Sequence, residues 1–247
     1  MDRLIYTAMT GAKHTMEQQA TTSQNLANSS TTGFRAQIDS FRAVPVVGDG
    51  LATRTLVVDA TVGSDFSSGP IQQTGNSLDV AVQGDGWIAL QTDDGSEAYT
   101  RNGAFQVSQN GILQTQSGIP VAGEDGGPIS IPPNSSVTIG ADGTVSSIDT
   151  TSTPSNVTTL GKIKLVKPAS TNLIRGDDGL FRTKDSTPVE ADATVAVTGG
   201  ALEGSNVNMV DSMVNMINLS RQFDLHITML KTAETMDTSA EQVLTLS

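Results

Sequence analysis

The sequence contains no cysteine. Its absence excludes disulfides, thiolate metal ligands and cysteine nucleophiles, but it leaves the cellular compartment open. Proline is absent before Pro45 and after Pro188. Because proline breaks helices in their interior, its absence leaves both ends of the chain free to form long helices.

Apolar and aromatic residues are also few. Only 36% of the residues are hydrophobic and 4% aromatic, so a single compact core would be thin for 247 residues. No apolar run reaches the roughly 18 residues that cross a bilayer, which predicts a protein without membrane insertion. The first residues, MDRLIYT, lack the apolar run of a secretory signal. If the protein works outside the cytoplasm, we expect it to leave by a route without a cleavable signal.

Basic residues are outnumbered by acidic ones, and the net charge is −12. A nucleic-acid binder needs clustered lysine and arginine to contact phosphates, so the charge argues against nucleic acid as a partner. The acidic residues are spread along the chain and do not form an acidic tail.

The N-terminal segment predicts an amphipathic helix over residues 3–28. Apolar residues recur there in steps of four and three, and Gln19 and Ser23 fill the gaps between them. The apolar positions are Ile5, Met9, Ala12, Met16 and Leu26. Gly33 can adopt the left-handed conformation that ends a helix.

The C-terminal segment predicts a stronger helix, since neither glycine nor proline occurs from Ser205 to Ser247. Ser205 and Asn206 are candidate N-caps. One apolar stripe comprises Met213, Met216, Phe223, Ile227 and Leu230, widened by Val210, Val214 and Ile217. A second comprises Met229, Ala233, Met236, Ala240 and Val243. The N-terminal helix alone cannot cover so broad a surface, so further helices, most simply from other copies, are expected beside it. The methionines fit an adaptable binding face and an ordinary helix core equally well.

Between the helices, Asp-Gly and Asn-Gly pairs separate short, partly alternating apolar runs. Such pairs suit type I′ hairpin turns, in which both central residues have positive φ. The predicted fold class is therefore α+β, with long terminal helices packing together in a coiled-coil-like manner around an inserted antiparallel β domain. We expect a helical assembly domain (1–34 plus 205–247), a connector region with some strand (35–75 plus 186–204) and the β domain (76–185).

The middle of the chain offers little chemistry. Residues 84–89 match the G-x-G-x-x-A dinucleotide fingerprint, but that motif needs a following helix, and the sequence WIALQ favours a strand after a hairpin turn. Residues 93–95 and 177–179 lack the ligand pattern of a calcium loop. His14 and His226 could meet across a helix contact as metal ligands, although surface or groove positions are favoured. We therefore expect no enzyme activity, no catalytic residues, no cofactor, no metal site and no small-molecule substrate.

Four stretches resemble the rod and hook family of bacterial flagellar axial proteins. The first runs from Gln18-Gln19-Ala20 through NLAN (25–28) to TGFR (32–35), and the second is LDVAVQGDGW (78–87). The third is YTRNGAF (99–105), continuing to Asn110-Gly111. The fourth is GALEGSNVN (200–208), leading into MVNMI (213–217). Together they reach both ends and the middle of the chain.

Within the family, the opening IYTAM (5–9), the stretch FRAVPV (41–46) and the short length resemble the proximal-rod members. Hook and distal-rod members usually carry Gln-Arg-Ala-Tyr where this chain has Ser220-Arg221-Gln222-Phe223, which also favours the proximal rod. A distal-rod or hook-type relative remains an alternative. So does a non-flagellar β-domain binding module with oligomerising helices, which would use exposed Trp87 and Tyr99.

The resemblance implies a structural subunit of the flagellar basal body that performs no catalysis. It implies export through the flagellar type III apparatus and helical stacking in the periplasm, with other copies and neighbouring proximal- and distal-rod proteins as partners. The subunits would form a driveshaft that transmits torque for motility, with the terminal helices lining the tube. The expected assembly interface comprises Ile5, Met9, Met16, Asn25, Leu26, Asn28, Gly33, Phe34, Met213, Met216, Ile217, Phe223, Ile227 and Leu230.

Overall fold

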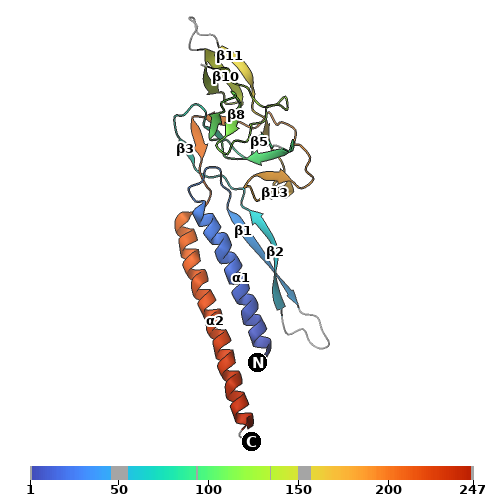
Figure 1. Ribbon diagram of the computed structural model, residues 1–247, viewed down its shortest axis with the longest axis vertical. Helices are drawn as coiled ribbons and strands as arrows, with labels where there is room; N and C mark the ends of the chain where they lie inside the picture. Colours follow the sequence, from blue (N-terminus) through green and yellow to red (C-terminus); the bar gives the residue numbers. More distant parts are fainter. Residues whose placement is uncertain (1, 46–54, 93, 134, 150–156, 246–247) are drawn as a thin grey trace. The chain divides into compact units, whose positions relative to one another are not determined.

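The computed structural model describes residues 2–45, 55–92, 94–133, 135–149 and 157–245. It is an α+β protein, as predicted, with a helix at each end and antiparallel strands between them (Figure 1). Two compact units are distinguished. Residues 1–29, 36–65 and 207–247 form the helical unit, and residues 30–35 and 66–206 form the β unit. No helix in the described part of the chain is long and apolar enough to cross a membrane.

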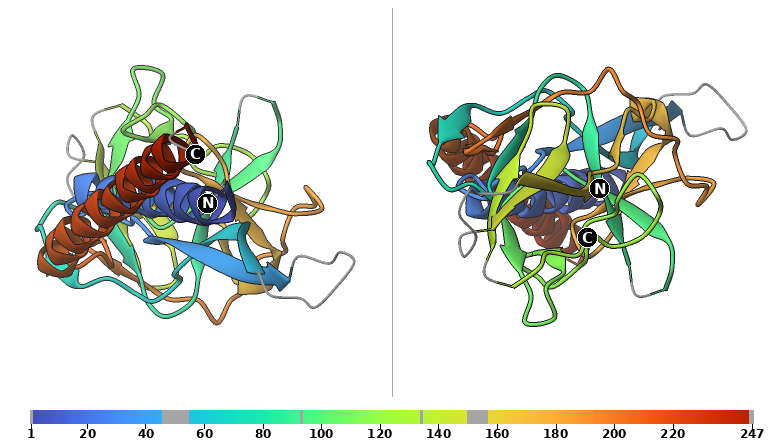
Figure 2. Two further views of the ribbon diagram at one scale, coloured as in Figure 1. Left: turned by 90° about the horizontal axis from the view of Figure 1, so that it is seen from below. Right: turned by 90° about the horizontal axis from the view of Figure 1, so that it is seen from above.

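The helical unit contains α1 (Asp2–Ala27), α2 (Met209–Thr245) and the antiparallel pair of β1 (Gln37–Pro45) and β2 (Thr55–Ser64). The two helices lie side by side and run antiparallel (Figures 1 and 2). The register of the strand pair shifts between Ser40 and Phe41, which marks a bulge. This pair lies in the segment 35–75, which the sequence predicts as a connector with some strand.

Small side chains of α1 are buried in the helical unit. Ala8, Ala12 and Thr15 are buried and follow the three- and four-residue spacing of one helix face. Gly11 lies among them, and a Cβ built there would stand 2.6 Å from Cε1 of His226. Of the predicted stripe, Ala12 is buried, and Ile5 and Leu26 are half-buried. Met9 and Met16 are exposed, so the buried face is only partly the predicted one.

Both helix boundaries differ from the predicted ones. α1 ends at Ala27, so Gly33 does not end it, although Gly33 does have a positive φ of 68°. α2 begins at Met209, and its cap is Asn208 and not Ser205 or Asn206. The Asn208 Oδ1 accepts hydrogen bonds from the backbone N–H groups of Val210 (3.0 Å) and Asp211 (3.4 Å), as an N-cap side chain does.

The β unit is built from short strands. They are β3 (Ile71–Gln73), β4 (Val80–Val82), β5 (Trp87–Gln91), β6 (Glu97–Thr100), β7 (Phe105–Val107), β8 (Leu113–Thr115), β9 (Ser135–Ile139), β10 (Thr144–Asp149), β11 (Val157–Lys162), β12 (Leu165–Val166), β13 (Leu173–Arg175), β14 (Phe181–Thr183), β15 (Val197–Gly199) and β16 (Ala201–Glu203), with a 3-10 turn η1 (Ser170–Asn172). The largest sheet has the order β12-β5-β6-β14-β13, and β11-β10-β9 forms another. The β unit also contains three two-stranded sheets: β15-β4, β16-β3 and β7-β8.

The β unit has two apolar clusters. The larger contains Val80, Ile88, Leu113, Val145 and Ile163, among others. The smaller surrounds Trp87, Tyr99 and Phe181, with the Trp87 and Phe181 ring centroids 4.7 Å apart. Trp87 is only 4% exposed and Tyr99 1%. The prediction that these two rings are exposed is therefore wrong, because β5 and β6 are buried on both faces.

The turns differ from the predicted type I′. In the described residues, the sole non-glycine residue with positive φ is Ser186, so the Asp or Asn before each turn glycine is not left-handed. At Asn110-Gly111 the Gly111 N–H donates to the Ser108 carbonyl, and the Ser108 N–H donates to the Ile112 carbonyl. Gly140–Thr144 has the same pattern. This is a type I turn followed by a left-handed glycine bulge, the next commonest hairpin connection.

The observed units divide the chain differently from the three predicted domains. Residues 36–65 group with the helices, and residues 66–75 and 186–206 group with the β unit. The reason for the second difference is strand pairing: β3 pairs with β16 and β4 with β15, so the chain enters and leaves the β unit on paired strands.

Candidate assembly surface and buried arginine–glutamate cluster

Large apolar side chains are exposed along both helices. On α1 they are Tyr6, Met9 and Met16, and on α2 they are Met209, Val210, Met213, Val214, Ile217, Leu225, Met229 and Met236. We call this set the exposed helix surface. Large exposed apolar patches are typical of protein–protein contact sites, which makes this surface a candidate for subunit contact. The expectation that α1 leaves much of the apolar surface of α2 uncovered is confirmed.

The residues expected at the assembly interface fall into three groups. Met9, Met16, Met213 and Ile217 are exposed. Ile5, Leu26, Asn28, Met216, Phe223, Ile227 and Leu230 are half-buried. Asn25, Gly33 and Phe34 make specific contacts within the chain. Sequence reasoning left out Tyr6 and Leu225, which lie outside the apolar stripes although both are large and apolar.

Asn25 ties α1 to β1. Its side-chain Nδ2 donates to the Gln37 carbonyl (2.9 Å), and its Oδ1 accepts from the Gln37 N–H (2.8 Å). Four residues earlier, Thr21 Oγ1 donates to Asp39 Oδ1 (2.9 Å). The amide of Asn25 therefore satisfies both polar groups of one backbone position, as a neighbouring strand would.

A polar hollow of about 480 Å³ lies in the helical unit beside these bonds. Its walls come from α1, β1 and α2, and amide and hydroxyl side chains dominate them: Gln18, Thr21, Thr22, Asn25, Asn215, Asn218 and Gln222. Among its lining residues Asp39 alone is ionisable. The hollow can exchange hydrogen bonds with a partner, but it lacks the paired acid and base that proton-transfer chemistry needs.

All four family-like stretches contribute residues to one region of the β unit. Thr32 Oγ1 donates to Asn102 Oδ1 (2.9 Å), and the Gly33 N–H donates to the Glu203 carbonyl (2.8 Å). A Cβ at Gly33 would lie 2.3 Å from the Asn102 nitrogen, so only glycine fits there. Phe34 is buried, and the Arg175 guanidinium stacks 4.5 Å from its ring centroid. Gly33 and Phe34 therefore hold the β unit together.

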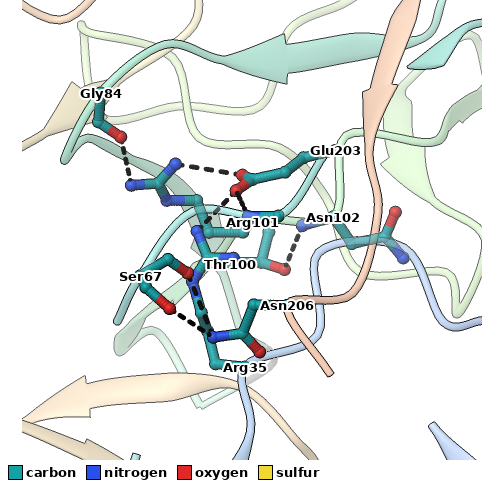
Figure 3. A network of polar contacts seen from close by, with 9 residues as sticks. Arg35, Ser67, Gly84, Thr100, Arg101, Asn102, Glu203 and Asn206 are labelled. Atoms are coloured by element: carbon teal, nitrogen blue, oxygen red, sulfur yellow. Dashed lines mark hydrogen bonds and ion pairs between the residues drawn. The ribbon is translucent and has the colours of Figure 1, made fainter. Parts of the chain in front are cut away.

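At the centre of this convergence, one carboxylate joins two arginines (Figure 3). Glu203 Oε1 accepts from Arg35 Nη2 (2.8 Å) and from the Gly69 N–H (2.9 Å). Glu203 Oε2 accepts from Arg101 Nη1 (3.0 Å), and Arg101 Nη2 donates to the Gly84 carbonyl. We call Arg35, Arg101 and Glu203 the buried arginine–glutamate cluster.

The cluster carries an excess positive charge away from water. Its three side chains are at most 2% exposed, and two guanidinium groups share one carboxylate. Burial lowers the pKa of Arg101, an effect opposed by Glu203 and reinforced by Arg35. Arg35 Nε, Arg35 Nη1 and Arg101 Nε have no hydrogen-bond partner among the described residues.

No metal or cofactor site emerges from the described residues. His14 bonds to Glu17 (2.9 Å) and meets the Phe41 ring edge-on, while His226 packs at Gly11. No group of three or more potential ligands among His, Cys, Asp and Glu is found in the described part of the chain. The glycines at 84 and 86 precede strand β5, which confirms the interpretation as a turn and not a nucleotide loop.

Comparison with known protein families gives three matches along the chain. Residues 5–35 match the family described as "Flagella basal body rod protein". Residues 81–147 match "Flagellar hook protein FlgE/F/G D1 domain". Residues 198–243 match "Flagellar basal body rod FlgEFG protein C-terminal".

Full-length relatives agree with these matches. The chain is 47% identical to the flagellar basal-body rod protein FlgF of Escherichia coli K12 and 46% identical to that of Salmonella typhimurium LT2, in both cases over 100% of both chains. It is 30% identical to the rod protein FlgG of Bacillus subtilis, over 95% of this chain and 96% of that one. The chain belongs to the flagellar basal-body rod protein family, and it is more similar to these FlgF relatives than to the FlgG one.

Proposed function

We propose that this protein is a structural subunit of the proximal rod of the flagellar basal body. The exposed helix surface is the structural observation that supports the proposal, in addition to the membership of the rod protein family. In this role the chain performs no catalysis, and it supports motility by transmitting torque through its contacts with other subunits.

The two helices differ in length. At about 1.5 Å per residue, the 37 residues of α2 span roughly 56 Å, whereas the 26 residues of α1 span roughly 39 Å. α1 therefore cannot cover α2 along its whole length. Burying the remaining apolar side chains against another subunit is worth about 25 cal/mol for each Å² removed from water.

The partners follow from the same surface. Contacts that join two different faces and do not close a ring generate helical assemblies. We propose that α1 and α2 of successive copies, and of neighbouring proximal- and distal-rod proteins, pack in a coiled-coil-like manner into the wall of a tube in the periplasm. The apolar and motif residues expected at the interface from the sequence, together with Tyr6 and Leu225, would take part.

We also propose that the chain reaches the rod through the flagellar type III export apparatus. The support is the resemblance to the axial family. A non-flagellar binding module is not proposed as a second function, because the rings of Trp87 and Tyr99 on which it depended are buried.

The proposal is tested by introducing a charge on the exposed helix surface. Ile217 is 54% exposed on α2, so Ile217→Asp should leave the monomer folded while it removes swimming motility. The physical reason is that a carboxylate in an apolar subunit contact is costly unless paired. Motility is measured by complementing a strain that lacks the protein, and folding is measured by circular dichroism of the purified chain.

Val157→Asp is the matched control. Val157 is 62% exposed, but it lies on β11 in the β unit, and motility should persist. Normal motility of the Ile217→Asp strain, with the variant protein present in its basal bodies, would contradict the proposal.

A further inference from the structure

A second hollow of about 480 Å³ lies within the β unit, at the start of β5. Its lining includes Phe66, Asp85, Trp87, Arg101, Lys167 and Ser170. None of them belongs to the exposed helix surface. We call it the Trp87 pocket.

One side of the pocket is apolar. The rings of Phe66 and Trp87 meet edge-to-face with their centroids 5.9 Å apart, and the Trp87 ring is held from behind by Phe181. Such a wall accommodates a short aliphatic segment of a ligand. Phe66 is only half-buried, so the wall is open to solvent at one end.

The pocket also has a cationic wall next to the Trp87 ring. Arg101 lines it, with its guanidinium carbon 5.3 Å from the Trp87 ring centroid. Arg101 is 2% exposed, and its Nε finds no hydrogen-bond partner among the described residues. Behind it, Arg35 shares the single carboxylate of Glu203. A buried charge without full compensation is costly, so this wall favours an anion in front of it.

Lys167 supplies a second cation, at the mouth of the pocket. Its Nζ is 3.9 Å from Asp85 Oδ2, which exceeds hydrogen-bond distance. The Asp85 side chain is 81% exposed, so this contact is a weak surface pair. Lys167 and the two arginines are opposed by Asp85 and Glu203, and the five groups together carry a net charge of +1.

We infer that the Trp87 pocket binds a carboxylate carried on a short aliphatic stem. The ammonium of Lys167 and the hydroxyl of Ser170 donate to the carboxylate, and the cluster behind Arg101 stabilises its charge. The stem lies against the half-buried Phe66 ring, beside Trp87. The inference does not depend on the rod function, because every group belongs to the β unit of one copy.

Two sources could present this chemistry. One is a free aliphatic dicarboxylate, and the other is an Asp or Glu side chain of a second copy. The chain carries 26 acidic residues, so another copy offers many candidates. A comparison of glutarate binding with self-association separates the two sources.

The test uses Trp87 itself, because it is the single tryptophan of the chain. Glutarate added to the dilute full-length protein should change the tryptophan fluorescence saturably, with a dissociation constant on the order of 1 mM for so small a ligand. Glutaramide, which has the same shape but no charge, should cause no saturable change.

Two lysine variants locate the binding. Lys167→Gln should weaken glutarate binding about tenfold, as the loss of one charged hydrogen bond does. Lys162→Gln removes the same charge from β11, where Lys162 pairs with Glu124 at 3.3 Å, and it should leave the affinity unchanged. Circular dichroism checks that both variants are folded.

Sedimentation velocity then identifies the source. If Lys167→Gln also weakens self-association of the concentrated protein, the carboxylate comes from a second copy. Equal self-association of both proteins assigns the pocket to a free carboxylate. The inference is overturned if glutarate gives no saturable response, if glutaramide gives an equal one, or if Lys167→Gln binds as tightly as the native chain.

Discussion

Glu203 is the residue on which the buried arginine–glutamate cluster depends. It accepts hydrogen bonds from two arginines and from the Gly69 N–H. Arg35, Arg101 and Glu203 come from three separate parts of the sequence, so this one carboxylate links segments that are distant along the chain. Replacing a buried ion pair by apolar groups can be neutral, whereas removing one partner leaves an uncompensated charge.

Glu203→Gln should therefore lower the free energy of unfolding of the β unit by roughly 3–5 kcal/mol. Urea unfolding followed by the fluorescence of Trp87 measures it. Glu124→Gln is the control, since its pair with Lys162 is exposed and should contribute less than about 1 kcal/mol. Equal losses in the two variants would show that the cluster is not the stabilising element.

Tyr99 makes the free energy of unfolding of the β unit depend on pH in the alkaline range. Burial raises the pKa of its hydroxyl from 10.0 to about 12, while the hydrogen bond from the Val189 N–H lowers it and the Glu97 carboxylate raises it. The folded state thus favours the neutral phenol. The corresponding stability is fully present below about pH 10 and is lost as the pH rises towards about 12.

The expected outcome is a larger fall in the free energy of unfolding between about pH 9 and about pH 11 for the native chain than for Tyr99→Phe. Urea titrations at the two pH values measure the difference. Tyr6→Phe, on exposed α1 surface, should behave like the native chain. An identical fall in the native chain and Tyr99→Phe would refute the assignment.

At the scale of elements, the α1–α2 contact depends on a glycine that sequence patterns treat as a weak point. Glycine in a helix interior costs about 1 kcal/mol relative to alanine. At Gly11 this cost is offset by space for the His226 ring, since a Cβ would stand 2.6 Å from its Cε1. The pairing of glycine with histidine is therefore a matched contact between the helices.

A double-mutant cycle tests this contact. Gly11→Ala should stabilise the His226→Ala background by about 1 kcal/mol, which is the gain in helix propensity. In the native background the same change should stabilise less or destabilise, because the imidazole must move. Urea unfolding followed by far-ultraviolet circular dichroism measures both arms. The same effect in both backgrounds would mean that Gly11 and His226 do not interact.

In the β unit, sequence patterns predict where the hairpins lie but not how their turns are built. The Asx-Gly pairs correctly indicate hairpins in the middle of the chain, but not the turn type. Gly111 has a positive φ, whereas Asn110 before it does not, since the bulged hairpin needs only one left-handed residue. Glycine is needed at position 103 for a different reason. A Cβ there would lie 1.8 Å from the Val80 carbonyl oxygen.

At the scale of the whole molecule, the two units differ in how much of their surface is buried. Strands β4, β5 and β6 are almost wholly buried. Along α2, in contrast, Ser212 and Ala233 are the sole buried residues among those whose side chains are described. Local opening is easier where few apolar contacts hold an element, so we expect the helices of a single copy to open more readily than the strands of the β unit.

Hydrogen exchange should show this difference directly. In the free monomer we expect the amides of α1 and α2 to exchange faster than those of β4 and β5, because ordering the helices is only partly compensated within one chain. In assembled rods the helical amides should become protected while the strands change little. Strong protection of α2 already present in the dilute monomer would contradict the expectation.

The sequence by itself determined the fold class, the two terminal helices and the family. Proline-free ends, Asx-Gly punctuation and four local motifs are short-range signals, and they need no knowledge of distant contacts. The turn-and-strand interpretation of residues 84–89 was likewise local, since WIALQ contains no helix signal after the glycines.

Only the tertiary structure decided which residues each element buries. The rings of Trp87 and Tyr99 are covered because their sheet is packed on both faces, which no single strand reveals. Gly33, Arg35, Arg101 and Glu203 carry no local pattern of contact, and their convergence requires the folded β unit. The large methionines of α1 stay exposed, whereas the small side chains Ala8, Ala12 and Thr15 are buried.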